Sequence, residues 1–365
     1  MKAIILLLYL MFVSITVSFP QDAVNVNSAE QYFTTDDYKR IPKTDVHCHI
    51  DTERCTFMEQ AAEDNFRIIS INTDASGNPP IGEQQRLALV QRNVCSPQLA
   101  YLTTFSMKGW EEDGWQDKTI AYIQESINMG ALGIKVWKNI GMVEKDRNNR
   151  FIMIDDPKFD PVFDFLEKKG IPVCGHLGEP RNCWLPVEEM TVNNDKSYFR
   201  EHPEYHMYLH PDYPSYDAQI QARDNLLKKH PGLIFIGVHL GSLEWSVDEL
   251  AKRFETFPNM SVDLAARICH IQKQAQSDWS KVRDFFIRYQ DRILYGTDQG
   301  DEGSSDPLQL KKDLHNTWLK DWEFFTTDHM MTSRDLDGEF KGLHLPRNVV
   351  EKIYNQNAAR WLYQR

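Results

Sequence analysis

The chain alternates short apolar segments, typical of buried strands, with longer amphipathic segments, typical of helices. We predict eight strands, at residues 44–49, 67–73, 99–106, 131–137, 171–176, 233–239, 260–264 and 292–297. Helical patterns lie between them, at residues 118–129, 160–169, 216–230, 248–256 and 277–289. Eight strands in alternation with helices predict an α/β fold, a closed parallel (β/α)8 TIM barrel. The length of 365 residues suits one such barrel with loop insertions.

Two connections are longer than the usual link between a strand and a helix. They cover residues 179–215, after the fifth predicted strand, and residues 299–346, after the eighth. Both follow the C-terminal end of a strand, and this is the face at which barrel enzymes place their active-site loops. We therefore expect the two insertions to shape a substrate pocket. A surface insertion or a dimer contact is the alternative.

The first residues have the pattern of an export signal. A positive start at Lys2 precedes an apolar run over residues 4–17, and Thr16 and Ser18 suit the positions before a cleavage site. The run is shorter than the roughly 20 residues that a membrane-spanning helix needs. We predict a signal peptide at 1–18, a polar lead-in at 19–40 and the barrel at 41–365. The protein is then exported, periplasmic or secreted, with no stable membrane anchor after cleavage; an uncleaved anchor is the alternative.

The charge and the cysteine content limit the classes of partner and the covalent links that we expect for this chain. The chain has 41 Lys and Arg against 53 Asp and Glu, a net charge of −12. Nucleic acid binding needs clustered positive charge, so we expect a small-molecule substrate and no nucleic-acid partner. Six cysteines show no Cys-X-X-Cys pair, and their spacing does not say which of them would form a disulfide. Whether the chain forms a homo-oligomer is left open.

Polar side chains lie at the ends of five predicted strands. They are His47, His49, Lys135, His176, His239 and Asp298. Stability alone does not require so many imidazole and carboxylate groups at strand ends, whereas a metal centre does. Neutral imidazole is the commonest protein ligand for Zn²⁺. We predict a divalent metal site, most simply zinc with manganese as the alternative, holding one or two ions.

The alternation of side chains along each strand supports the same six residues as candidate metal ligands. Successive side chains of a strand face opposite ways, so His47 and His49 share a face. If that face is the barrel interior, Val46, Cys48 and Ile50 face the helices.

The other strands are interpreted in the same way. Ile134 and Val136 are expected to face outward beside an inward Lys135, and Ile236 and Val238 beside an inward His239. His176 and Asp298 also take the inward position. Lys138 falls on the opposite parity from Lys135, which makes Lys135 the better ligand candidate.

The order of these motifs resembles the metal site of the amidohydrolase superfamily. The segment 130–135 is similar to the strand that carries a modified lysine in urease-like members, and residues 237–242 and 357–360 look most like the amidohydrolase-related, family-2 branch. That branch contains hydrolases and decarboxylases. Many of its members bind one metal and lack the lysine.

The resemblance implies a role for each of the six residues. His47, His49 and His176 would be metal ligands, and Lys135, carboxylated by CO2, would bridge two ions. His239 would bind a second metal or orient the substrate. Asp298 would be a ligand that also takes the proton from the attacking water and passes it to the leaving group.

The sequence therefore predicts a metal-dependent hydrolase that opens an amide, ester or lactone bond of a small molecule. Metal binding lowers the pKa of water from about 15.7 towards about 7, which makes hydroxide available at neutral pH. A nonoxidative decarboxylase using the same metal is the alternative reaction, and a noncatalytic ligand-binding barrel is the alternative of another class. Arg181 and Arg267 are predicted to bind a substrate carboxylate; a salt-bridged or solvent-facing arginine is the other interpretation.

Overall fold

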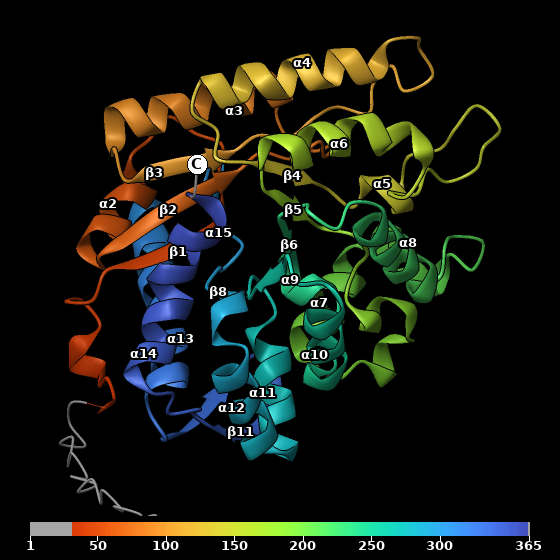
Figure 1. The fold of residues 1–365 in the computed structure, drawn as a ribbon. Helices are drawn as coiled ribbons and strands as arrows, with labels where there is room; N and C mark the ends of the chain where they lie inside the picture. Colours follow the sequence, from red (N-terminus) through yellow and green to blue (C-terminus); the bar gives the residue numbers. More distant parts are fainter. Residues whose placement is uncertain (1–30, 364–365) are drawn as a thin grey trace, which may run out of the picture.

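The computed structural model describes residues 31–363, and helices surround its parallel strands (Figure 1). All eight predicted strands are present. They are β1 (Lys43–Ile50), β2 (Phe66–Ile71), β3 (Leu99–Leu102), β4 (Ile134–Val136), β5 (Val173–Gly175), β6 (Phe235–Gly237), β7 (Met260–Asp263) and β8 (Ile293–Leu294). The predicted signal peptide, 1–18, and residues 19–30 of the lead-in lie outside the described residues.

The strands form two parallel sheets, with the orders β3-β2-β1-β9 and β4-β5-β6-β7-β8, where β9 is Gln299–Asp301. These ladders do not run continuously round a closed barrel. Isolated backbone hydrogen bonds join the sheets instead. Lys135 N–H donates to Thr103 O at 2.7 Å beside β4, and Val46 N–H donates to Tyr295 O at 3.0 Å beside β8. The fold is thus the predicted TIM-barrel class, with two seams that a few backbone hydrogen bonds hold together.

Helices follow the strands, most of them on the outside (Figure 1). Their bounds are α2 (Thr56–Glu63), α3 (Ile81–Val90), α4 (Trp115–Asn128), α5 (Asn139–Met142), α6 (Asp160–Lys169), α7 (Asn193–Glu201), α8 (Tyr216–Lys229), α9 (Val238–Gly241), α10 (Val247–Thr256), α11 (Ile268–Ser277), α12 (Trp279–Arg288), α13 (Pro307–Thr326), α14 (Arg347–Glu351) and α15 (Asn357–Leu362). Local signals set many of these ends. Helix α6 has a proline in its first turn and ends at Gly170, whose φ of 61° is left-handed. The Ser215 and Ser246 hydroxyls cap α8 and α10.

Two apolar clusters separate the inside of the ring from the outside. The larger one packs strands against helices and includes Phe163, Val173 and Trp318. The smaller one gathers side chains from β1, β2, β3, β5, β6 and β8 with the last helix. Its members are Val46, Ile69, Ile71, Leu102, Cys174, Ile236, Val238, Leu294, Ala358, Trp361 and Leu362. Side chains from so many strands meet only inside the ring, so α15 closes one end of the interior.

The predicted alternation is wrong at one position of β1. Cys48 and Ile50 join the outer cluster as expected, but Val46 belongs to the inner cluster with His47 beside it. The cause is a shift in the pairing of β1 with β2 between Asp45 and Cys48. Such an irregularity breaks the period of two, so neighbouring residues can face the same side.

The alternation is also wrong on β6. Ile236 and Val238 belong to the inner cluster, not to the helix-facing one. His239 nevertheless turns into the barrel mouth because the strand ends at Gly237, and His239 and Leu240 take left-handed φ values of 58° and 57°. Such backbone costs on the order of 1–3 kcal/mol per residue and is typical of functional sites.

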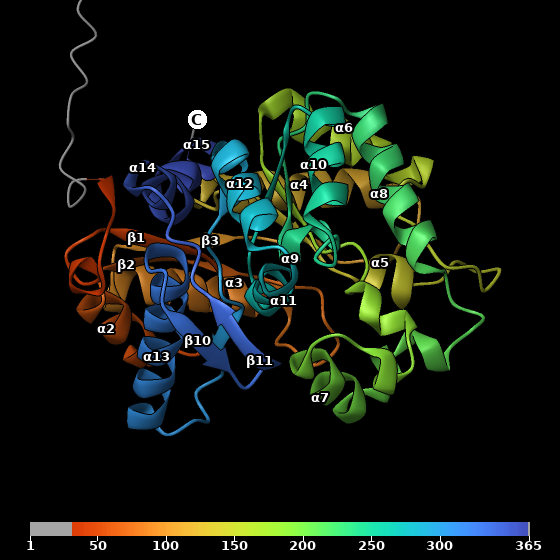
Figure 2. The same cartoon turned by 90° about the horizontal axis from the view of Figure 1, so that it is seen from below.

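The two long insertions contain structure of their own and contact each other. Residues 179–215 carry α7, and residues 299–346 carry α13 and the hairpin of β10 (Met330–Ser333) and β11 (Leu336–Lys341). The Asn193 N–H donates to Asp335 O at 2.7 Å, and Figure 2 shows α7 beside the hairpin. Across residues 31–363, every helix is too short or too polar to cross a membrane.

Candidate metal centre

All six polar residues predicted from strand ends line one cavity. Its volume is about 620 Å³, and it opens where the parallel strands end. The predicted residues in its wall are His47, His49, Lys135, His176, His239 and Asp298. Trp137, Lys138, Tyr198 and His202 also line it. The sequence thus located this cavity, because the C-terminal ends of parallel strands meet on one face of a barrel.

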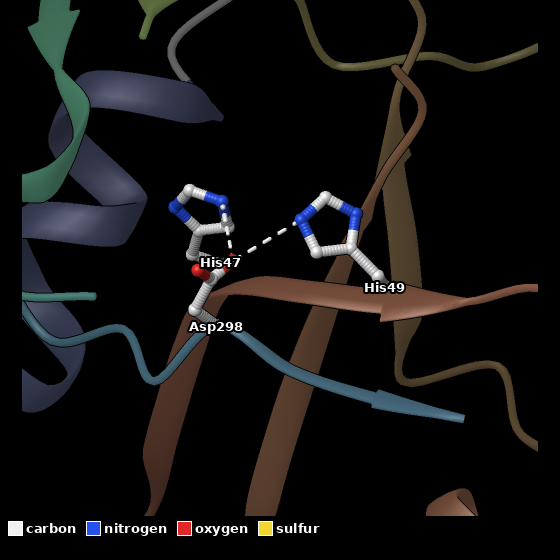
Figure 3. A group of neighbouring side chains, drawn as sticks. All are labelled: His47, His49 and Asp298. Atoms are coloured by element: carbon white, nitrogen blue, oxygen red, sulfur yellow. Dashed lines mark ion pairs between the residues drawn. The ribbon is translucent and has the colours of Figure 1, made fainter. Parts of the chain in front are cut away.

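His47, His49 and Asp298 form the tightest group, and Figure 3 shows ion pairs from both rings to the carboxylate. The Nε2 atoms of His47 and His49 each lie 3.2 Å from Asp298 Oδ1. Asp298 has a left-handed φ of 69°, because the chain has already left β8 before it reaches this residue. That turn aims its carboxylate at the two rings.

Two cavity histidines are held by backbone carbonyl groups through Nδ1. His49 Nδ1 lies 2.8 Å from Ile71 O, and His239 Nδ1 lies 2.8 Å from Ala265 O. A carbonyl only accepts, so each Nδ1 carries the proton in the neutral ring. The lone pair of each Nε2 is therefore free to point into the cavity, as metal ligation requires.

His47 is oriented in the same way by a carboxylate that the sequence analysis missed. Its Nδ1 lies 2.7 Å from Oδ2 of Asp263, which is buried at the end of β7. Asp263 Oδ1 also accepts the His239 N–H at 2.7 Å, so one side chain positions two of the candidate ligands. Asp263 lies in a predicted strand, and a carboxylate at such a strand end was the signal that could have found it.

Lys135 and His176 complete the inner wall. Lys135 is buried, and its Nζ lies 3.2 Å from His47 Nε2. The His176 ring lies 4.3 Å from the His239 ring, and its Nε2 is buried without a hydrogen-bond partner among the described residues. A buried imidazole nitrogen without a partner is costly, and a bound cation would satisfy it.

The electrostatics favour the protonation states that bind metal. Burial lowers the pKa of His47, His176 and His239, which favours their neutral form. Burial alone would raise the pKa of Asp298, but the facing rings of His47, His239 and His49 hold it well below its ordinary value. Neutral imidazoles around a carboxylate fit a divalent cation of the zinc type.

Comparison with known proteins agrees with this donor set. The sequence profile of the family described as amidohydrolase matches residues 107–363. The chain belongs to the amidohydrolase family. The predicted family is thereby confirmed, and enzymes of this family depend on a metal and include hydrolases and decarboxylases. No curated protein matches the chain in sequence.

Solved structures show the same fold. An uncharacterized TIM-barrel protein from Bordetella bronchiseptica is similar with a TM-score of 0.51 and 15% identity, over 88% of this chain and 99% of that one. The 2,6-dihydroxybenzoate decarboxylase from Rhizobium also has a TM-score of 0.51 at 15% identity, over 88% of this chain and 98% of that one. At such identities the likeness establishes the barrel fold of this amidohydrolase and not its reaction.

A charged network lies behind the cavity of the amidohydrolase. Lys138 Nζ forms an ion pair with Glu179, whose Oε2 lies 3.4 Å from His176 Nε2 and 3.8 Å from Arg267 Nη2. Burial alone would lower the pKa of Lys138, but Glu179 raises it above its usual value. Lys138 therefore lines the cavity as an ammonium with a carboxylate partner, whereas Lys135 has none so close.

The two arginines predicted to bind substrate lie outside the residues that line this cavity. The Arg181 guanidinium stacks 4.4 Å from the centre of the Trp245 ring. Arg267 is buried among carboxylates, including Glu179. Their role in substrate binding stays a prediction.

Proposed function

We propose that this amidohydrolase is a metal-dependent hydrolase that cleaves a C–N or C–O bond of a small molecule, in an amide, ester or lactone. The supporting observation is the placement of Lys135, a buried amine 3.2 Å from His47 Nε2 in the middle of the candidate ligands. His47, His49, His176, His239 and Asp298 are the side chains that would hold the metal. A divalent ion there supplies Lewis acidity and makes water acidic enough to ionise near neutral pH.

Asp298 is the proposed proton shuttle. Its pKa is held well below the ordinary value, so the side chain enters the reaction as a carboxylate that can accept a proton. Oδ1 takes a proton from the attacking water and later gives it to the leaving nitrogen or oxygen. The attacking water and the leaving atom must then come within hydrogen-bond reach of this oxygen, and Asp298 lines the 620 Å³ cavity.

Lys135 is proposed to act as a carbamate. Burial lowers the pKa of its amine against the pull of Asp263 and Asp298, which favours the neutral, nucleophilic form. The Nζ lone pair attacks the carbon of CO2, an N–C bond forms, and one proton leaves to water. The product is an anionic oxygen ligand where an ammonium would repel a cation.

The hydrolase is tested by chemical rescue. The first step is metal analysis of the purified protein and a screen against lactones, esters and N-acyl compounds. We then expect Lys135→Ala to lose activity that CO2 or a short carboxylic acid partly restores, since bicarbonate formed from CO2, or the carboxylate of the acid, supplies an anionic oxygen ligand. Lys138→Ala is the matched control and should act more mildly. An essential Lys138 beside a dispensable Lys135 would reject this role for Lys135.

The alternative reaction is nonoxidative decarboxylation. Its support is the likeness in fold to 2,6-dihydroxybenzoate decarboxylase, with a TM-score of 0.51. The two reactions separate in one assay, because a decarboxylase releases CO2 from an aromatic acid and leaves esters and amides intact. Release of CO2 without turnover of any lactone, ester or N-acyl compound would reverse our order of preference.

We also propose that the protein is exported after cleavage of residues 1–18. A disulfide between Cys55 and Cys95 supports this proposal, since such bonds persist in oxidising compartments. The experiment is N-terminal sequencing of protein recovered outside the cytoplasm. A mature chain that begins at Met1 would refute cleavage.

A further inference from the structure

A second group of histidine and carboxylate side chains lies on the outer helices. Asp160, Asp164 and Glu167 occupy one face of α6, at intervals of four and three residues. His230 follows α8 directly and turns towards that face. Helices α6 and α8 are neighbours on the outside of the barrel (Figure 1). None of the four residues lines the catalytic cavity.

His230 is the informative member of this group, which we call the α6–α8 cluster. Its side chain is only 4% exposed, and neither ring nitrogen has a hydrogen-bond partner among the described residues. Nδ1 lies 3.3 Å from Asp164 Oδ1 and 3.6 Å from Glu167 Oε2, and Nε2 lies 3.7 Å from Asp160 Oδ1. A buried imidazole with two unpaired nitrogens needs an explanation.

These separations are too long for direct hydrogen bonds and suit ligands of a common ion. A hydrogen bond from nitrogen to oxygen spans about 2.7–3.2 Å. Two ligands about 2.0–2.2 Å from a tetrahedral zinc ion lie roughly 3.3–3.6 Å apart. His315 and Asp64 show the contrast within this protein, because His315 Nδ1 lies 2.8 Å from Asp64 Oδ2 as an ordinary ion pair.

Glu167 is held in a ligating orientation by the backbone. The Gly232 N–H donates to Glu167 Oε1 at 2.5 Å, which leaves Oε2 facing His230. A Cβ atom at position 232 would lie 2.5 Å from Oε1, so a larger residue there would push the Glu167 carboxylate out of this position. The chain segment after His230 is thus shaped around this carboxylate.

The local charge leaves room for a cation. Lys229 Nζ pairs with Asp160 at 2.8 Å. Within residues 31–363, neither Asp164 nor Glu167 forms an ion pair with a lysine or arginine, and His230 is the ion-pair partner of both. Two carboxylates beside one imidazole match a divalent cation of the zinc type, with water from the exposed side of Asp164 completing the shell.

We propose that the α6–α8 cluster is a second divalent cation site, with His230 Nδ1, Asp164 and Glu167 as ligands and Asp160 facing the other ring nitrogen. The ion would join α6, which leads into β5, to the end of α8, which leads into β6. The insertion 179–215 lies between these two helices in the chain. The site would therefore join two helices that precede and follow this insertion in the chain. It is independent of the proposed reaction.

Zinc stoichiometry tests the site directly. The full chain is stripped with a chelator, dialysed against Zn²⁺ alone, and its metal content is measured. We expect the wild type to hold one more zinc per chain than His230→Asn. His315→Asn is the matched control, because it removes a histidine that already pairs with a carboxylate, and it should bind as the wild type does. Equal zinc content in the wild type and His230→Asn would overturn the proposal.

A variant at an exposed position provides a second test in case His230→Asn does not fold. The Asp164 side chain is 70% exposed, so Asp164→Asn should fold normally. Loss of a direct ligand should weaken the zinc affinity of the cluster by at least about 10-fold. The measurement is the zinc-dependent rise in melting temperature in a His47→Ala/His49→Ala background, where the cavity centre is removed. An unchanged rise on adding Asp164→Asn, or no rise in that background, would also reject the site.

Discussion

The catalytic cavity and the α6–α8 cluster use the same side chains with different support. In the cavity, His47 and His49 face Asp298 at 3.2 Å, and each ring is fixed by a hydrogen bond at Nδ1. In the cluster, His230 faces Asp164 at 3.3 Å, and neither ring nitrogen is hydrogen-bonded within the described residues. The distances between the histidine nitrogen and the carboxylate oxygen are similar in the two places. Only in the cavity, however, do hydrogen bonds fix the orientation of the rings.

This difference indicates that a tight metal site needs ligands whose orientation is fixed before the ion binds. A ligand whose other nitrogen is already bonded has its tautomer and direction fixed before the ion arrives, so little order is lost on binding. Strand ends supply such partners, because other strands end at the same face: β2 presents a carbonyl to His49, and β7 presents a carboxylate to His47. The surfaces of two packed helices do not present hydrogen-bond partners at such regular positions. We therefore expect the cavity to bind its ion more tightly and the cluster to depend on its ion for order.

The largest effect is expected from removing both histidines of β1. His47→Ala/His49→Ala takes away two candidate ligands, so the cavity should lose its metal and turnover should fall to background. Zinc at the α6–α8 cluster should remain. Metal content per chain, measured with and without this double change, tests both statements. Wild-type stoichiometry in the double variant would show that these histidines are not ligands.

Asp298→Asn should reduce turnover by about 10²-fold or more, the general scale for losing an acid–base group. The amide keeps the size of the side chain but cannot accept the proton of the attacking water. Folding should change far less than turnover. The readouts are kcat, metal content and melting temperature on a verified substrate. A near-normal kcat would move the proton shuttle to His239.

Asp263→Asn tests whether a residue that only orients the candidate ligands affects metal binding. It leaves all candidate ligands in place but removes the carboxylate from His47 Nδ1, so metal affinity should fall by about 10–100-fold. Asp64→Asn is the matched control. Asp64 is likewise buried and lies 2.8 Å from a histidine Nδ1, that of His315, and it accepts from Gln60 Nε2 at 2.8 Å, but it does not line the cavity. That change should cost about 1–3 kcal/mol of stability with little effect on metal affinity.

The smallest effect concerns pH. A lowered imidazole pKa means that the neutral ring persists to lower pH, and burial lowers the pKa of His47, His176 and His239. Protons should therefore compete with the cavity ion only below the pH at which an ordinary imidazole, with a pKa of about 6.5, becomes charged. Between pH 7.5 and 6.5 we expect metal content in the cavity to change by less than about twofold. A tenfold loss over that interval would contradict the effect of burial.

The sequence determined the fold class and placed six polar residues of the cavity wall at one face. Alternating strand and helix patterns predict parallel strands, and parallel strands bring their C-terminal ends to one face whatever the details of packing. His47, Lys135 and Asp298 could therefore be placed together without knowing a single contact. The order and direction of the strands alone place these residues at one face. They therefore line one cavity, although the predicted facing of side chains was wrong on β1 and β6.

Only the tertiary structure decided which way several side chains point and what holds them. Val46 turned inward because the pairing of β1 with β2 shifts there, and His239 reached the cavity through a left-handed turn after β6. The Cys55–Cys95 disulfide and the approach of His230 to α6 join residues that are far apart in the chain. Local periodicity describes one element at a time, whereas register shifts, strained turns and long-range contacts depend on the element packed against it.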